Sequence, residues 1–141
     1  EKTKSFLLSC GIKIIKASSY YETLSWPDPQ KPKYLNIVIQ INTNLQPSKL
    51  LEIFKSIEKK LGRKKAIKNS PRECDIDIIA YGNKIIRNKL DIPHLRMHNR
   101  SFVLIPLYEL NQNWVHPKLN INIKNLIFSL PIKDIRSIKQ I

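Results

Sequence analysis

Two aspartates stand two positions apart in an otherwise apolar stretch, which reads ECDIDIIA over residues 73–80. Its β-branched content predicts a strand, and residues two apart on a strand point to the same side, so Asp75 and Asp77 should project together. The opposite, core-facing row would then hold Cys74, Ile76, Ile78 and Ala80. Neighbouring carboxylates repel each other unless a cation lies between them, and such oxygen ligands suit Mg²⁺ on a substrate phosphate. The alternative is a solvated strand end whose acids pair with lysines, which is the commoner outcome for an isolated pair.

Dense positive charge precedes the two acids. The basic residues of this loop are Arg63, Lys64, Lys65, Lys68 and Arg72. Cations next to a pair of metal-bridging acids are what a nucleoside triphosphate requires. An exposed lysine-rich loop explains the individual lysines equally well, but it explains the two arginines less well.

The stretch DIPHLRMHNRSF adds His94, His98 and Arg100. A zinc site at His94 and His98 is disfavoured, because Pro93 precedes them and no third ligand is close in sequence. His94 fits better as a hydrogen-bond donor to phosphate, with Arg100 beside it. His116 is interpreted as structural.

The elements that must position these groups follow from periodicity and breakers. Apolar residues at helical spacing end at Gly11, and β-branched runs predict strands over residues 12–23 and 35–42 around a proline-rich loop at residues 24–33. A helix is predicted from Pro47 to Gly62, and shorter helices at residues 101–110 and 123–130. The order of elements favours an α+β domain with helices on an antiparallel sheet.

Composition sets wider limits. The 141 residues fit one domain, and 25 Lys and Arg against 11 acids give a formal charge of +14, which predicts an anionic partner. A compositional bias towards Lys, Ile and Asn would produce the same charge. No run resembles a membrane span or a secretory signal, so the protein is expected to be soluble and cytoplasmic. Cys10 and Cys74 are expected to be buried, reduced thiols.

Several motifs together resemble one family. They are SSYYET, YLNIVIQINT, LGRKK, PRECDIDIIAYGN, IPHLRMHNRSFVLIPLYEL and HP, over residues 18–117. Their order and spacing are similar to those of the 6-hydroxymethyl-7,8-dihydropterin pyrophosphokinase family. The resemblance implies a ferredoxin-like, three-layer α+β fold with helices on both faces of an antiparallel sheet. It also implies a monomer that transfers pyrophosphate from ATP to the pterin hydroxymethyl group in folate biosynthesis, without a nucleic-acid or membrane partner.

The resemblance also implies roles for individual residues. Asp75 and Asp77 match the ligands of two magnesium ions on the triphosphate, which Arg63, Arg72, His94 and Arg100 would hold. Tyr34 and Phe102 match the aromatic pair around the pterin, and Asn36 matches the amide that reads its edge. Thr23 and Leu24 match the start of the loop lining that pocket. Positions near the nucleotide are matched by Glu58, Ile78, Lys89, Asp91 and Leu95. Residues 24–33 and 63–71 resemble two loops that close over the substrates.

Two further expectations concern the chain as a whole. It opens within a helix and lacks the family's first strand, so residues 1–141 are expected to be a single pyrophosphokinase domain that is N-terminally incomplete. The absent strand would lie between the strand of Tyr34 and the strand of Asp75 and Asp77. The competing class is a basic nucleic-acid-binding module without catalysis, which would leave the two acids unexplained.

Overall fold

A computed structural model describes residues 2–23, 34–62 and 74–141 of the chain. The helices are α1 (Lys2–Ser9), α2 (Pro47–Lys60), the 3₁₀ helix η2 (Met97–Asn99), α3 (Ser101–Leu110), α4 (Ile123–Phe128) and α5 (Ile132–Ser137). The strands are β1 (Lys13–Ala17), β2 (Tyr21–Thr23), β3 (Tyr34–Asn36), β4 (Ile39–Asn42), β5 (Ile86–Arg87), β6 (Asp91–Ile92) and β7 (Lys139–Gln140).

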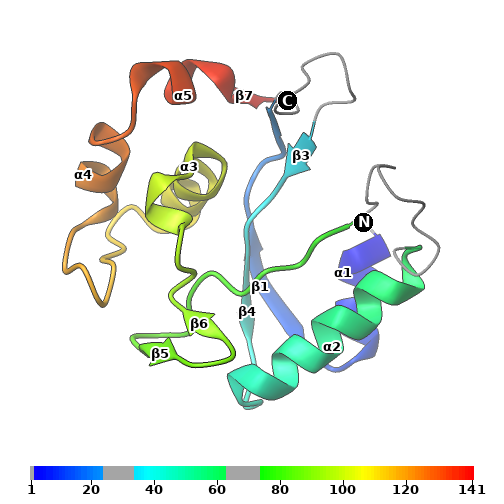
Figure 1. Cartoon of the computed structure of the whole chain (residues 1–141). Coiled ribbons are helices and arrows are strands. Elements are labelled where there is room, and N and C mark those ends of the chain that lie inside the picture. Colours follow the sequence, from blue (N-terminus) through cyan, green and yellow to red (C-terminus); the bar gives the residue numbers. More distant parts are fainter. Residues whose placement is uncertain (1, 24–33, 63–73) are drawn as a thin grey trace.

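All strand pairs among the described residues are antiparallel. β1 pairs with β4, β2 lies between β3 and β7, and β5 pairs with β6. Figure 1 shows α1 and α2 on one side of β1 and β4, and α3 on the other side. The expected α+β class, with helices on both faces of antiparallel strands, is therefore confirmed.

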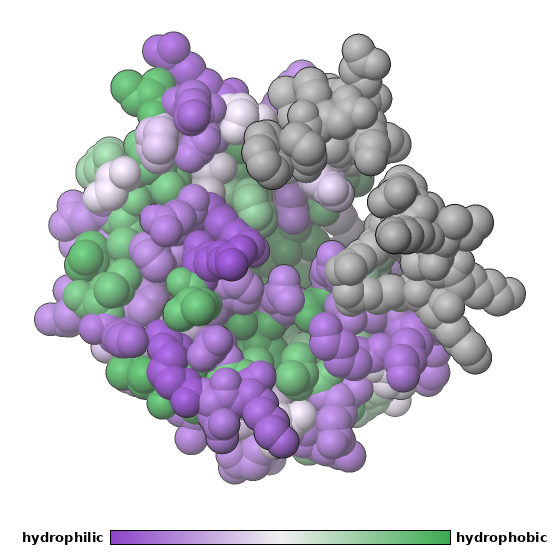
Figure 2. Space-filling model, viewed as in Figure 1, coloured by the Kyte–Doolittle hydropathy of each residue, from purple (hydrophilic) through white to green (hydrophobic). Residues whose placement is uncertain are grey.

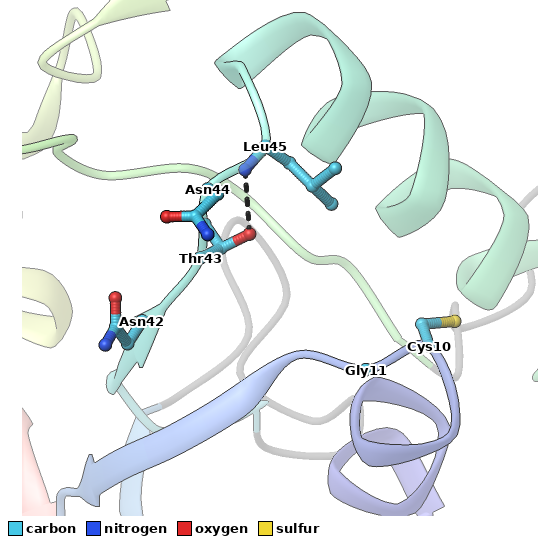
Figure 3. A pocket seen from close by; sticks show the side chains of 6 residues that line it. All are labelled: Cys10, Gly11, Asn42, Thr43, Asn44 and Leu45. Atoms are coloured by element: carbon cyan, nitrogen blue, oxygen red, sulfur yellow. Dashed lines mark hydrogen bonds between the residues drawn. The ribbon is translucent and has the colours of Figure 1, made fainter.

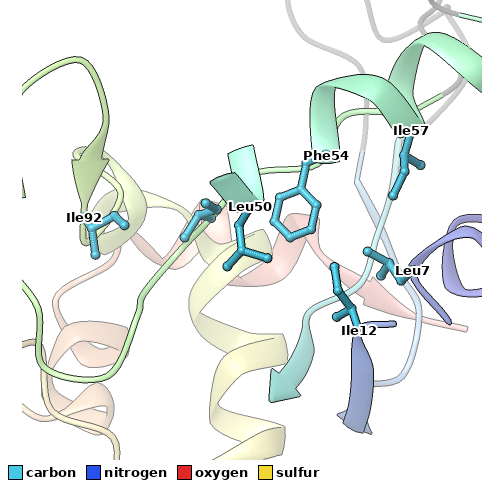
Figure 4. Packing of buried hydrophobic residues seen from close by; sticks show 7 residues of the cluster. Leu7, Ile12, Leu50, Phe54, Ile57 and Ile92 are labelled. Atoms are coloured by element: carbon cyan, nitrogen blue, oxygen red, sulfur yellow. The ribbon is translucent and has the colours of Figure 1, made fainter. Parts of the chain in front are cut away.

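Helix α2 forms where its sequence predicts. Pro47 occupies the first turn, where its missing N–H costs nothing, and the chain leaves the helix at Gly62, whose φ is +108°. Leu50, Phe54 and Ile57 recur at helical spacing and are buried against Leu7 and Ile12 (Figure 4). This first cluster forms the core beneath the β1–β4 pair.

A second apolar cluster surrounds α3. Its buried members are Met97 of η2, Val103 and Leu104 of α3, Ile123 and Leu126 of α4, and Leu130. Pro106 is tolerated inside α3, which runs unbroken to Leu110. The second cluster therefore fixes the helix whose first residues follow Arg100.

Three expectations about local structure were wrong. Residues 74–80 were predicted as a strand but form no strand ladder in the described part of the chain, because no neighbouring strand pairs with them. The strands predicted over residues 12–23 and 35–42 are each divided in two, the first into β1 and β2 around Ser18 and the second into β3 and β4, which pair with different partners. Both cysteines are free, as expected, but Cys10 is exposed and Cys74 is partly buried.

Candidate active site

Asp75 and Asp77 are both exposed, and the residues between and after them alternate in burial as the sequence predicted. Ile78 belongs to the first cluster, whereas Ile79 packs against the second cluster. Residues two apart on an extended backbone share a side, so the two aspartates face the side of η2 and α3. The pattern therefore orients the carboxylates even though the segment is not a paired strand.

Two hydrogen bonds hold this segment. The Oε2 atom of Glu58 on α2 accepts the N–H of Ile76 at 2.6 Å, between the two aspartates. On the other side, the carbonyl of Ile79 accepts the N–H of His94 at 2.8 Å. Glu58 is 1% exposed and its Oε1 lies 3.4 Å from the Nζ of Lys55. The segment is thus fixed to α2 on one side and to the loop before η2 on the other.

One ring nitrogen of His94 already accepts a hydrogen bond from the backbone. Its Nδ1 accepts the N–H of Arg96 at 3.2 Å, so the proton of the neutral ring lies on Nε2. Partial burial is the main cause that lowers the pKa of His94, and Arg100 lowers it further, while Asp77 opposes the change. A neutral histidine that carries its proton on Nε2 is a donor suited to a phosphate oxygen.

Arg100 and Phe102 lie together at the start of α3. The guanidinium carbon of Arg100 is 5.5 Å from the centroid of the Phe102 ring, within the range of a cation–π contact. Arg100 also acts electrostatically on His94 and lowers the pKa of that ring. The resemblance assigns Arg100 to the triphosphate and Phe102 to the pterin, and the two side chains are neighbours.

The β2–β3 ladder presents one face to α3. Tyr21 is opposite Asn36, and Thr23 is opposite Tyr34. Opposed residues, and residues two apart, share a face of an antiparallel pair, so these four side chains lie on the same face. Tyr21 donates a hydrogen bond to Glu109 of α3, which turns that face towards the helix carrying Phe102. Tyr34 remains 55% exposed.

The other expected residues are distributed differently. Glu58 is buried on α2, and Ile78 is buried in the first cluster. Lys89, between β5 and β6, and Leu95 are exposed, and Asp91 lies on β6. Leu24, Arg63 and Arg72, and the loops at residues 24–33 and 63–71, lie outside the described residues. Tyr21 and Glu109 were not singled out from the sequence. The seven-residue spacing of Phe102 and Glu109 on one helix was the available signal.

The donor set fits a metal that is shared with a substrate. Nowhere in residues 2–23, 34–62 and 74–141 do three or more His, Cys, Asp or Glu side chains form a group that could hold an ion. Mg²⁺ usually takes one or two protein carboxylates and completes its shell with water and substrate phosphates. Two exposed aspartates on one side satisfy that requirement.

A cavity of about 370 Å³ lies elsewhere, where α1 ends and α2 begins (Figure 3). It is lined by Cys10, Gly11 and residues 42–45, none of which was expected in the site. Figure 2 shows that the face drawn in Figure 1 is also hollowed near its centre, with hydrophobic residues visible at the floor. Within the described residues, none of the helices is both long and apolar enough to cross a membrane.

An α+β fold that gathers exposed carboxylates, a neutral histidine and an arginine on one side is typical of proteins that transfer phosphoryl groups. The chain belongs to the 7,8-dihydro-6-hydroxymethylpterin-pyrophosphokinase family, whose profile matches residues 2–112. The resemblance indicated by the motifs is therefore confirmed.

Individual relatives agree with this family. The chain is 36% identical to the 2-amino-4-hydroxy-6-hydroxymethyldihydropteridine pyrophosphokinase of Aquifex aeolicus, over 96% of this chain and 77% of that protein. It is 40% identical to the enzyme of the same name from Haemophilus influenzae, over 77% of this chain and 68% of that protein. It is also 40% identical to the folic acid synthesis protein fol1 of Pneumocystis carinii, over 91% of this chain but 17% of that protein.

Proposed function

We propose that the protein transfers the terminal pyrophosphoryl group of ATP to the hydroxymethyl group of 6-hydroxymethyl-7,8-dihydropterin, giving AMP and the pterin diphosphate for folate biosynthesis. The proposal rests on one observation, which is that a group of charged and polar side chains and the β2–β3 face both lie next to α3. Asp77 and His94 stand near Arg100 at the start of the helix. The β2–β3 face with Tyr34 and Asn36 is turned towards the same helix.

The reaction needs little covalent work from the protein. The pterin hydroxyl oxygen attacks the β-phosphorus of ATP, the bond from that phosphorus to the oxygen bridging the α-phosphate breaks, and AMP leaves with that oxygen. The hydroxyl proton passes to solvent. The protein contributes alignment of the two substrates and stabilisation of the charge on the phosphate oxygens.

Each part of the site has a role in this proposal. Asp75 and Asp77 would hold two magnesium ions, which when bound neutralise the triphosphate and polarise its oxygens. The Nε2–H of His94 and the guanidinium of Arg100 donate to phosphate oxygens. Tyr34 and Phe102 stack on the pterin ring, and Asn36 bonds its edge. Glu58 and Ile78, which are buried, act from below by supporting the aspartate segment rather than by touching the nucleotide.

Amide substitutions of the two aspartates test the proposal. Asp75→Asn and Asp77→Asn keep the size of the side chain but remove the charge, so AMP formation should fall by at least about a hundredfold in each. Thermal melting should change little, because both side chains are exposed. Glu52→Gln, which alters an exposed acid on α2, serves as the matched control and should retain activity. Activity near that of the wild type in either aspartate variant would refute the assignment.

A binding experiment separates this function from the nucleic-acid alternative. A pyrophosphokinase should bind a non-hydrolysable ATP analogue more tightly when Mg²⁺ is added, and Asp77→Asn should remove that enhancement. A nucleic-acid-binding module should instead bind duplex DNA with an affinity that falls steeply with salt and does not depend on Asp77. The second pattern without the first would overturn the proposed function.

A further inference from the structure

A hydrogen-bond network centred on one carboxylate joins three separate parts of the chain, which are α3, residues 19–21 and β7. The Oε1 atom of Glu109 on α3 accepts the hydroxyl of Tyr21 at 2.7 Å. Its Oε2 accepts the N–H of Ser19 at 2.8 Å and the hydroxyl of Ser19 at 3.1 Å. Ser19 Oγ in turn accepts the Nε2–H of Gln140 on β7 at 3.0 Å. We refer to Glu109, Tyr21, Ser19 and Gln140 as the α3–β2 latch, and none of its members belongs to the site proposed above.

The latch stays in one protonation state across the neutral range. Burial, followed by the hydrogen bond and charge of Glu109, raises the pKa of Tyr21 to about 12. Burial pushes the pKa of Glu109 upwards, but the hydrogen bonds from Tyr21 and Ser19 outweigh it and hold that pKa below its usual value. Tyr21 therefore remains a donor and Glu109 an acceptor, so the latch is a permanent connection and not a pH switch.

The helix transmits the position of the latch to Phe102. Phe102 and Glu109 are seven positions apart on α3, so they lie about two turns apart on the same face, roughly 10 Å along the axis. An unbroken helix is stiff over this length. A change in how Glu109 is held therefore moves or tilts the end of the helix that carries Phe102 and Arg100.

The latch also holds the facing surface. Tyr21 lies directly opposite Asn36 on β3, and its neighbour two positions on, Thr23, lies opposite Tyr34. Tyr21 is 7% exposed, whereas Tyr34 is 55% exposed, so the latch anchors the buried end of a face whose other end is open. The hydrogen bond between Tyr21 and Glu109 thus fixes the separation between the β2–β3 face and the helix.

We propose that Glu109 is a positioning residue that sets the separation between Phe102 and the β2–β3 face, which we call the slot, and thereby the affinity for a flat bicyclic substrate. This inference rests on the proposed function, because it assigns the pterin to that slot. Glu109 itself touches no reacting atom. Its effect should be larger on pterin binding than on ATP binding. Asp75, Asp77 and His94 are held by α2 and the loop before η2, so of these phosphate-side groups and Arg100 it is Arg100 that adjoins the start of α3.

Three variants of the full-length protein test the latch. Glu109→Ala removes both acceptors, and Tyr21→Phe removes one donor and keeps the ring. Glu109→Gln keeps an oxygen for Ser19 and offers its amide N–H to the Tyr21 oxygen, so it should restore most of the network. Glu52→Gln is the control for loss of an exposed acid elsewhere. The KM for each substrate, kcat, the pterin Kd by calorimetry and the melting temperature are measured for all four.

In Glu109→Ala we expect the KM and Kd for the pterin to rise about threefold to thirtyfold, less than the full loss of hydrogen bonds to a charged group because part of that loss falls on stability. The KM for ATP should change less than about twofold. Tyr21→Phe should give a smaller change in the same direction, and Glu109→Gln should lie close to the wild type. The melting temperature of Glu109→Ala should also fall. Across the variants, however, the size of this fall should not correlate with the rise in the pterin Kd.

Two outcomes would overturn the inference. If the wild type transfers pyrophosphate and Glu109→Ala melts lower with equal changes in both KM values, Glu109 only stabilises the fold. If neither KM changes in that variant, the latch does not control the separation between Phe102 and the β2–β3 face. A wild type that binds neither pterin nor ATP would instead refute the proposed function, so the two failures are distinguishable.

Discussion

At the scale of single residues, His94 and His116 make the same kind of hydrogen bond in different surroundings. Each accepts a backbone N–H at Nδ1 from the residue two positions ahead, Arg96 in one case and Lys118 in the other. His94 remains partly exposed beside Asp77 and Arg100. His116 is 3% exposed and meets Trp114 and His98 edge-on, with ring centroids 5.7 Å and 6.2 Å away. Surroundings, and not local chemistry, separate a candidate ligand-binding histidine from a structural one.

The burial of His116 has a consequence for pH. Burial, helped by the positive neighbours His98, Arg87 and Lys118, lowers the pKa of His116 from its usual value of 6.5. Above that value neither the native nor the unfolded chain protonates this ring, so its effect on stability is constant. As the pH falls below 6.5, the unfolded chain binds a proton at this ring that the native state does not yet bind. The free energy of unfolding therefore decreases.

We therefore expect the free energy of unfolding to fall between about pH 7 and about pH 5, with a slope of at most about 1.4 kcal/mol per pH unit from this group. In His116→Asn the amide oxygen can accept the N–H groups of Lys118 and Leu119, and the titrating ring is gone. Urea unfolding across this range should show a weaker pH dependence in the variant. An unchanged dependence would show that other groups cause it.

At the scale of elements, α2 supports the aspartate segment through Glu58. The Ile76 N–H bonded by this carboxylate lies between Asp75 and Asp77, so the bond fixes the backbone from which both side chains project. A buried acceptor of this kind acts on stability and on the site together. Glu58 follows Phe54 by four positions and is buried on the apolar face of α2. The resemblance places it near the nucleotide, and in the structure it lies beneath the aspartate segment.

We predict that Glu58→Ala lowers the free energy of unfolding by about 1 to 3 kcal/mol, because it leaves the Ile76 N–H without its acceptor. It should also reduce kcat for AMP formation, since the aspartates lose their alignment. The exposed Glu52, in the same helix, should cost less than about 0.5 kcal/mol when changed to alanine. Urea titrations of both variants provide the comparison, and equal costs at the two positions would contradict the argument.

Strong local signals made some elements predictable. The spacing of Leu50, Phe54 and Ile57, with proline at one end and glycine at the other, located α2 within two residues. Residues 74–80 show the limit of such signals, because alternation predicts which side chains are buried but not whether a partner strand is present. The division of residues 12–23 has a similar cause. Ser18 is bonded through its N–H and Oγ to Val38, and this bridge separates β1 from β2.

At the scale of the whole molecule, the site joins groups that are distant in sequence. The pair Asp75 and Asp77 and the motif with His94 and Arg100 were recognisable, since each is local. The contact of Tyr21 with Glu109 spans 88 positions, and nothing local to either residue signals it. The sequence therefore predicted the fold class, and it supplied the residues of the candidate site, which stays a prediction. The arrangement of α3 against β2, which relates the two halves of the site, required the structure.

Net charge is the other property of the whole molecule that bears on function. A formal charge of +14 creates a positive potential that draws anions from solution, and the exposed acids Asp75 and Asp77 are a local exception to it. ATP is a polyanion, whereas the proposed pterin substrate is uncharged. The potential should therefore accelerate the encounter with one substrate and have no effect on the other.

We predict that raising NaCl from about 50 mM to about 300 mM slows the association of a non-hydrolysable ATP analogue by about twofold to tenfold, because the Debye length shortens and the steering field is screened. The association rate of the pterin, measured by stopped-flow fluorescence under the same conditions, should remain within about 1.5-fold, since an uncharged ligand feels no steering. Sodium sulfate at matched ionic strength is the control for specific effects of chloride. Equal slowing of both ligands would show that salt acts on the conformation of the site, and no slowing of either would show that the positive charge of this chain does not guide its substrate.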